Sequence, residues 1–136
     1  MADFIFFYGT LLPQHAPPNM RAVLIDLRPR GEGSVRGRLF DFGAHPGAVL
    51  SDSAKTRVFG KVFQLPEDDA VLAKLDEYEG FDPSAPDSDW FVRKRVTVSM
   101  DDGSLLPCWI YEYKGDATGL PIIASGRFAH RDGSDG

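Results

Sequence analysis

The segment Phe4-Ile5-Phe6-Phe7-Tyr8-Gly9-Thr10-Leu11 is the most informative stretch of this 136-residue sequence. Its first five residues are apolar or aromatic, which predicts a strand that is buried on both faces and central in its sheet. Gly9 ends the run, so the following backbone N–H groups lose their ladder partners and could hold a carboxylate or a developing oxyanion. An ordinary tight turn is the simpler interpretation of the same loop.

The residues after this loop predict short elements joined by turns. Apolar side chains recur at helical spacing between residues 19 and 27, and Pro29 and Gly31 are expected to end that helix. Short runs of β character then predict an antiparallel meander, at residues 35–42, 48–51 and 57–65. A hairpin is expected farther on, formed by residues 91–100 and 105–114. The fold class is therefore α+β.

A second helix is expected from Pro66 to about Glu79, with Gly80 as its stop signal. At about 100° per residue, Lys74 and Glu77 fall on one face of this helix. The opposite, apolar face carries Val71, Leu72, Leu75 and Tyr78.

Glu79 falls on the apolar face of the second helix, between the directions of Leu72 and Leu75. A carboxylate in that position loses solvation, which raises its pKa towards neutrality and suits general acid/base catalysis. Two structural interpretations stay open: a fraying last-turn residue, or an anchor that accepts backbone hydrogen bonds. Asp76 lies nearer the edge of the apolar face, and we interpret it as structural.

Composition and charge favour one cytoplasmic domain. Residues 1–128 form the expected domain, and the polar residues 129–136 are expected to be a disordered tail. The net charge is −5 and the basic residues are scattered, which disfavours nucleic acid as a partner. The sequence contains no apolar run long enough to span a membrane and no signal-peptide pattern.

The sequence offers no pattern for a metal or a disulfide. Cys108 is the only cysteine, so no intrachain disulfide and no thiolate metal site can form. The three histidines are His15, His45 and His130, which lack the spacing of a metal-binding motif. The sequence therefore gives no support for a metal site, and a zinc centre built from distant loops is the alternative that stays open.

Several segments, taken in order from about Phe4 to Arg127, resemble the gamma-glutamylcyclotransferase-like family, which includes AIG2-like plant proteins. No segment is specific alone, but the ordered set is. The matching segments are Phe7-Tyr8-Gly9-Thr10-Leu11, Gly37-Arg38-Leu39-Phe40-Asp41-Phe42-Gly43-Ala44-His45-Pro46-Gly47, Val58-Phe59-Gly60-Lys61-Val62-Phe63, Leu75-Asp76-Glu77-Tyr78-Glu79-Gly80-Phe81, Phe91-Val92-Arg93, Trp109-Ile110-Tyr111 and Ile123-Ala124-Ser125-Gly126.

The resemblance implies a small closed mixed β-barrel with a few packed helices. It also implies release of 5-oxoproline from a γ-glutamyl compound, by attack of the substrate's α-amine on its own γ-carbonyl and without metal or cofactor. Glu79 would be the acid/base residue. The loop that binds the glutamyl group would be Tyr8, Gly9, Thr10 and Leu11.

Phe91 departs from the family pattern, in which Tyr commonly begins the Tyr-x-Arg segment. Loss of the hydroxyl removes one possible hydrogen bond in or near the pocket, and we expect this to change the substrate or to weaken activity. A non-catalytic module that binds a small ligand on the same fold is therefore the alternative function. A third interpretation is a protein-interaction unit with exposed aromatic residues near Trp90 and Phe91. The sequence does not identify the group that leaves the γ-carbonyl or the oligomeric state.

Overall fold

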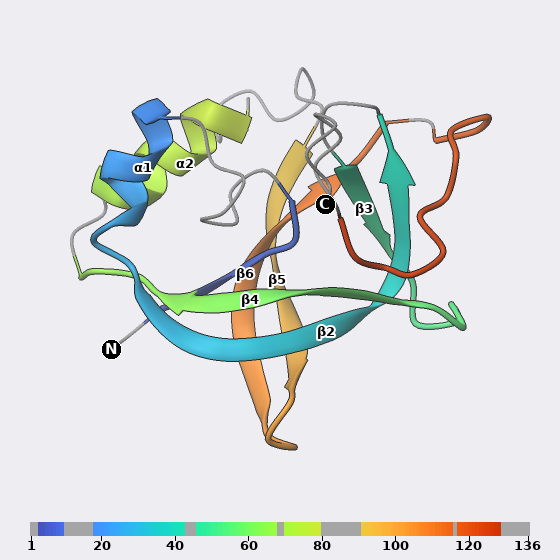
Figure 1. The fold of residues 1–136 in the computed structure, drawn as a ribbon, viewed down its shortest axis with the longest axis horizontal. Helices are drawn as coiled ribbons and strands as arrows, with labels where there is room; N and C mark the ends of the chain where they lie inside the picture. The colour runs from blue at the N-terminus through green and yellow to red at the C-terminus, as the bar shows by residue number, and fades with distance from the viewer. Residues whose placement is uncertain are drawn as a thin grey trace, which may run out of the picture.

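The computed structural model describes residues 3–9, 18–42, 46–67, 70–79, 91–115 and 117–128, apart from the side chains of Asn19 and Glu79. Within these ranges the chain forms six strands and two helices (Figure 1). In chain order they are β1 (Phe4–Phe7), α1 (Pro18–Leu24), β2 (Arg28–Asp41), β3 (Pro46–Leu50), β4 (Arg57–Gln64), α2 (Ala70–Glu79), β5 (Phe91–Met100) and β6 (Leu105–Tyr113).

Five of the strands close into a barrel. The strand order is β3-β2-β4-β1-β6-β5, and an additional pairing of β2 with β5 completes the ring. The pair β1–β6 is parallel, through Ile5 and Trp109, whereas the other pairs are antiparallel. β3 adds to β2 as a sixth strand. The closed mixed barrel that the resemblance implied is confirmed.

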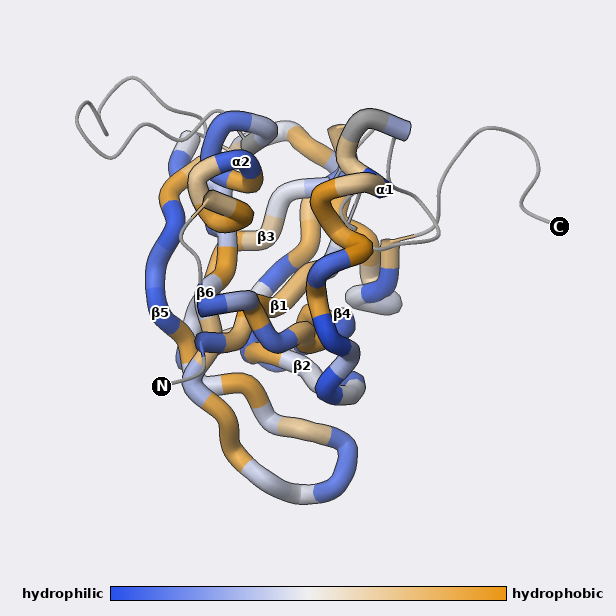
Figure 2. Tube along the Cα trace, turned by 90° about the vertical axis from the view of Figure 1, so that its left-hand side faces the viewer, coloured by the Kyte–Doolittle hydropathy of each residue, from blue (hydrophilic) through white to orange (hydrophobic). Residues whose placement is uncertain are grey.

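β1 is central, as its apolar run predicted. It pairs with β4 on one side and with β6 on the other, and Ile5, Phe6 and Phe7 are buried. Phe6 and Tyr8 belong to an apolar cluster with side chains from β2, β4, β5 and β6, which fills the barrel. Ile5 and Phe7 point to the other face and pack with residues of α1 and α2. Figure 2 shows apolar residues along β1 and on both helices.

Two expectations about helix boundaries were wrong. Pro29 and Gly31 do not end a helix: α1 ends at Leu24, and both residues lie in β2, where the register with β4 shifts between them. α2 begins at Ala70 instead of Pro66. The chain is still tied to the sheet just before Pro66, because the Leu65 N–H donates to the Asp3 carbonyl at 2.8 Å.

The strand boundaries agree more closely with the sequence analysis. β5 begins and ends where expected, and β4, β6 and β3 differ from expectation by one or two residues at an end. β2 is longer than its expected range because its first part pairs with β4. The loop at 82–89 and the tail at 129–136 lie outside the described residues.

Candidate active site

Several chain segments that are distant in sequence meet at one end of the barrel. β1 ends there, α2 passes beside it, and β3 and β5 begin there (Figure 1). Side-chain contacts of Tyr8, Asp76 and Tyr111 tie these ends together. Catalytic and binding residues often lie on loops that a rigid scaffold positions. This end of the barrel is therefore the candidate active site.

Tyr8 joins three strands through its hydroxyl. The phenol donates a hydrogen bond to the backbone carbonyl of Tyr111 in β6, at 2.6 Å. The same oxygen accepts one from the N–H of Ala48 in β3, at 3.1 Å. Tyr8 is 7% exposed, so both hydrogen bonds are shielded from water. The hydroxyl therefore fixes the position of Tyr8 at the end of β1.

Gly9 is required by close packing. A Cβ atom at this position would lie 2.5 Å from Cγ and 2.8 Å from Cδ of Pro46, the first residue of β3. No side chain fits between them, so only glycine lets the chain leave β1 in this direction. Thr10 and Leu11, the other two residues of the predicted loop site, lie outside the described residues.

Asp76 is the centre of a buried polar network at this end of the barrel. Its carboxylate accepts hydrogen bonds from Nε and Nη2 of Arg93, at 2.8 and 3.2 Å. It also accepts one from the Tyr111 hydroxyl at 2.7 Å. Asp76 is 6% exposed, and a buried carboxylate needs such partners to offset its lost hydration. The network fastens α2 to both strands of the β5–β6 hairpin.

The orientation predicted for α2 agrees with the exposure of its described side chains. Leu75 is fully buried, whereas Lys74 and Glu77 are exposed. Val71, Leu72 and Tyr78 pack against the core. The helix ends at Glu79, whose side chain lies outside what the structure describes, so its inward direction and its role stay predictions.

An aromatic cluster stands beside this network. Tyr113 makes edge-on contacts with Phe42 and Phe91, at ring-centroid distances of 4.8 and 5.9 Å. Phe91 is only 8% exposed, so the expectation of an exposed aromatic residue at this position was wrong. Trp90 lies outside the described residues. The first residue of the Phe91-Val92-Arg93 segment therefore belongs to the core, while the third binds Asp76.

The partners of Asp76 that the sequence analysis did not single out are Arg93 and Tyr111. Both occur in segments that carry the family resemblance, and that was the available signal. Their contacts with Asp76 span 17 and 35 residues of sequence, so spacing alone could not reveal them.

The described residues offer little else for chemistry. Among them, no group of three or more His, Cys, Asp or Glu side chains could hold a metal ion. Cys108 is fully buried, and loss of hydration raises the pKa of its thiol to about 12, so it is not a nucleophile near neutral pH. No helix in the described part of the chain is long and apolar enough to cross a membrane.

A closed mixed barrel with this strand order, and with a buried Asp–Arg–Tyr network at the end where β1 stops, defines a class of small α+β domain. The family model described as "Gamma-glutamyl cyclotransferase, AIG2-like" matches residues 5–130. The chain therefore belongs to the gamma-glutamylcyclotransferase, AIG2-like family.

Individual relatives are distant. The chain is 31% identical over 83 residues to "Putative gamma-glutamylcyclotransferase" of Halalkalibacterium halodurans, over 61% of this chain and 68% of that protein. An AIG2-like protein from Mus musculus has the same fold, with a TM-score of 0.68 at 21% identity, over 94% of this chain and 88% of that chain. YkqA from Bacillus subtilis also gives a TM-score of 0.68, at 23% identity, over 94% of this chain but 40% of that chain.

Proposed function

We propose that the protein is a gamma-glutamylcyclotransferase-type enzyme that releases 5-oxoproline from a γ-glutamyl compound. Family membership supports the class of reaction. One observation supports placing the reaction at this site. Asp76 anchors the last turns of α2 at the end of the barrel where β1 stops.

Glu79 is the acid/base residue in this proposal. It lies three residues after Asp76 and four after Leu75, and positions three and four apart share one face of a helix. Asp76 and Leu75 are both buried, and their burial supports an inward position for a residue on that face. A rigid helix end serves catalysis because an acid/base must be held within hydrogen-bond reach of the proton it moves.

The reaction is an intramolecular acyl transfer. The α-amine nitrogen attacks the γ-carbonyl carbon, forming the ring C–N bond, and the bond to the departing amine then breaks. Glu79 takes the proton from the attacking amine and returns it to the departing nitrogen. The backbone N–H groups of the loop from Tyr8 to Leu11 bind the α-carboxylate or stabilise the oxyanion of the tetrahedral intermediate.

Orientation supplies much of the rate enhancement in such a ring closure. A free γ-glutamyl chain is flexible, and the enzyme must hold its amine about 3 to 3.5 Å from its carbonyl carbon. The hydrogen bonds of Tyr8 and the close packing of Gly9 on Pro46 hold residues 8 and 9 in place, which supports this role.

The test is an assay of 5-oxoproline by mass spectrometry, with the purified protein and a panel of γ-glutamyl compounds. The panel includes γ-glutamyl amino acids, γ-glutamyl-ε-lysine and glutathione, because the leaving group is not fixed by the proposal. We expect Glu79→Gln to lower turnover by about 100-fold or more. The matched control is Glu77→Gln, which alters an exposed glutamate of the same helix and should retain activity.

The alternative is a binding module without turnover, and Phe91 is the observation that favours it. It predicts no 5-oxoproline from any member of the panel, together with a rise in Tm when a γ-glutamyl compound is added. Full activity of Glu79→Gln would instead show that the glutamate is structural.

A further inference from the structure

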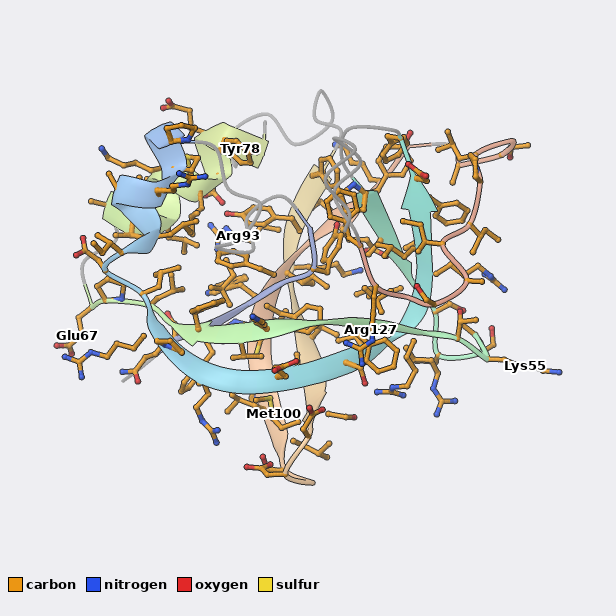
Figure 3. The ribbon with its side chains drawn as sticks, in the orientation of Figure 1. Lys55, Glu67, Tyr78, Arg93, Met100 and Arg127 are labelled. Carbon is orange, nitrogen blue, oxygen red and sulfur yellow. The ribbon has the colours of Figure 1, made fainter. Side chains whose placement is uncertain are left out.

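Five basic side chains gather on the outer face of β2 and β4, away from the candidate active site. Arg36 and Arg38 come from β2, Arg57 begins β4, Lys55 precedes it, and Arg127 follows the last described turn. We call this set the basic face. Figure 3 shows Lys55 and Arg127 on the same side of the barrel, beside β2 and β4.

Arg36 and Arg57 occupy directly opposed positions in the antiparallel β2–β4 ladder. Their side chains therefore leave the same face of the sheet with their Cβ atoms about 5 Å apart. Like charges placed in this way destabilise a sheet. Arg38 lies two residues beyond Arg36 on the same strand, so its side chain projects from that face as well.

Arg57 is held in place by neutral oxygen atoms. Its Nε donates to Ser34 Oγ at 2.7 Å, and its Nη2 donates to the Ser34 carbonyl at 3.2 Å and to Ser99 Oγ at 3.1 Å. These bonds draw the guanidinium across β2 and fix its orientation without cancelling its charge. A fixed, charged guanidinium is suited to receive an anion.

Arg127 is brought to the basic face by Gly126. The backbone of Gly126 adopts a positive φ of 71°, and a Cβ there would collide with the Arg57 carbonyl. The Gly126 carbonyl accepts a hydrogen bond from the Phe59 N–H at 2.8 Å. This contact places the guanidinium carbon of Arg127 4.2 Å from the centre of the Phe59 ring.

None of the five cations forms an ion pair with the described residues. The ion pairs found there are Arg93–Asp76, Lys94–Glu112 and Arg95–Asp3. Arg36 does contact Asp52, but through the backbone carbonyl at 3.4 Å. Since the whole chain carries −5, the residues outside the basic face together carry −10. The basic face is thus a local positive area on an acidic protein.

We propose that the basic face binds a short acidic segment of a partner protein in an extended conformation. Alternate residues of an extended segment lie about 6.5 Å apart on one side, which is also the spacing of Arg36 and Arg38 along β2. Ile122, 52% exposed and bridged to Phe40 of β2, offers an apolar contact beside the cations. The −10 carried elsewhere repels a long polyanion, and this favours a short acidic segment over nucleic acid.

The probe is a fluorescein-labelled peptide of about ten residues that alternates glutamate with valine, and binding is followed by fluorescence anisotropy. Each exposed ion pair contributes up to about 1 kcal/mol. We therefore expect the triple variant Arg36→Gln, Arg38→Gln, Arg127→Gln to weaken binding by about 10-fold or more. Binding should also weaken as salt increases from about 50 to 200 mM.

The control variant, Arg28→Gln, Arg30→Gln, removes exposed charges from the other end of β2 and should bind the peptide as the wild type does. Equal weakening in both variants would show an effect of net charge only and would overturn the proposal. So would tighter binding of a single-stranded oligonucleotide of the same length, which would point to phosphate recognition.

A stability measurement tests the basic face independently of any ligand. Since Arg36 and Arg57 repel each other in the free protein, Arg36→Gln should raise Tm, whereas Arg28→Gln should leave it unchanged. Saturation with the glutamate–valine peptide should raise the Tm of the wild type more than that of Arg36→Gln. A lower Tm for Arg36→Gln would mean that Arg36 is retained for stability, contrary to the proposal.

Discussion

The carboxylate of Asp76 and the guanidinium of Arg93 meet through two parallel hydrogen bonds, at 2.8 and 3.2 Å, although 17 residues separate them in sequence. This geometry matches the planar fork of arginine to both carboxylate oxygens. It connects α2, which ends at Glu79, to the strand that begins at Phe91.

Removal of the Asp76 charge should be costly because the largely buried Arg93 guanidinium loses the carboxylate that accepts two of its hydrogen bonds. We expect Asp76→Asn to lower the free energy of unfolding by about 3 kcal/mol, measured by urea denaturation. A double-mutant cycle with Arg93→Met should show strong coupling. The control is Lys94→Met. Lys94 lies next to Arg93 on β5, and its loss breaks the more exposed ion pair with Glu112 of β6, which should cost about 1 kcal/mol or less. Additive effects of the Asp76 and Arg93 variants would contradict this account.

Tyr8→Phe removes the oxygen that joins Tyr111 to Ala48. The Ala48 N–H then loses its buried acceptor, so we expect a loss of about 2 kcal/mol in stability. Amide hydrogen exchange gives a local readout, because the Ala48 amide should exchange faster while central amides such as that of Val62 keep their protection. Unchanged exchange at Ala48 would show that this hydrogen bond is not maintained in solution.

Gly9→Ala introduces a methyl group against the ring of Pro46. We expect this overpacking to lower the free energy of unfolding by about 1 to 3 kcal/mol, as measured by thermal denaturation. Pro46→Ala removes the Cγ and Cδ atoms that the methyl group would meet. The double variant should therefore be more stable than the sum of the two single changes predicts, and strict additivity would argue against the contact.

Cys108 should resist alkylation by iodoacetamide at pH 7 to 9 until the protein unfolds. Its pKa is raised by burial from 9.0 to about 12. Since the unfolded thiol ionises first, this group's contribution to stability is complete below about pH 9 and is lost as the pH rises towards 12. Between pH 7 and pH 10, urea denaturation should show a larger loss of stability for the wild type than for Cys108→Ala. Equal losses would contradict a buried neutral thiol.

Local patterns predicted the parts of the fold that local chemistry determines. The apolar run at Phe4 to Tyr8 predicted a central strand, and the runs at residues 91–100 and 105–114 predicted the β5–β6 hairpin. The first part of β2 was missed because it is stabilised by pairing with β4, which lies far along the chain. That pairing outweighs the local signals of Pro29 and Gly31.

The candidate site was predictable to a similar extent. Helical periodicity identified the buried face of α2, whereas the loop predicted after Gly9 lies outside the described residues. The contacts of Asp76 with Arg93 and Tyr111 depend on how the barrel closes, which periodicity does not encode. The basic face also could not be predicted from local sequence, because Arg36 and Arg57 become neighbours only through the register in which β2 pairs with β4.

The position of β1 has a consequence for biosynthesis. β1 is the first strand along the chain, yet its two neighbours are β4 and β6, so both are present only after residue 109 has been made. Until then Phe4-Ile5-Phe6-Phe7, a segment of strong β propensity without charge, has an unpaired edge. The barrel can therefore close only after β6 has been made, and a ribosome that stalls before β6 would leave a product prone to aggregation.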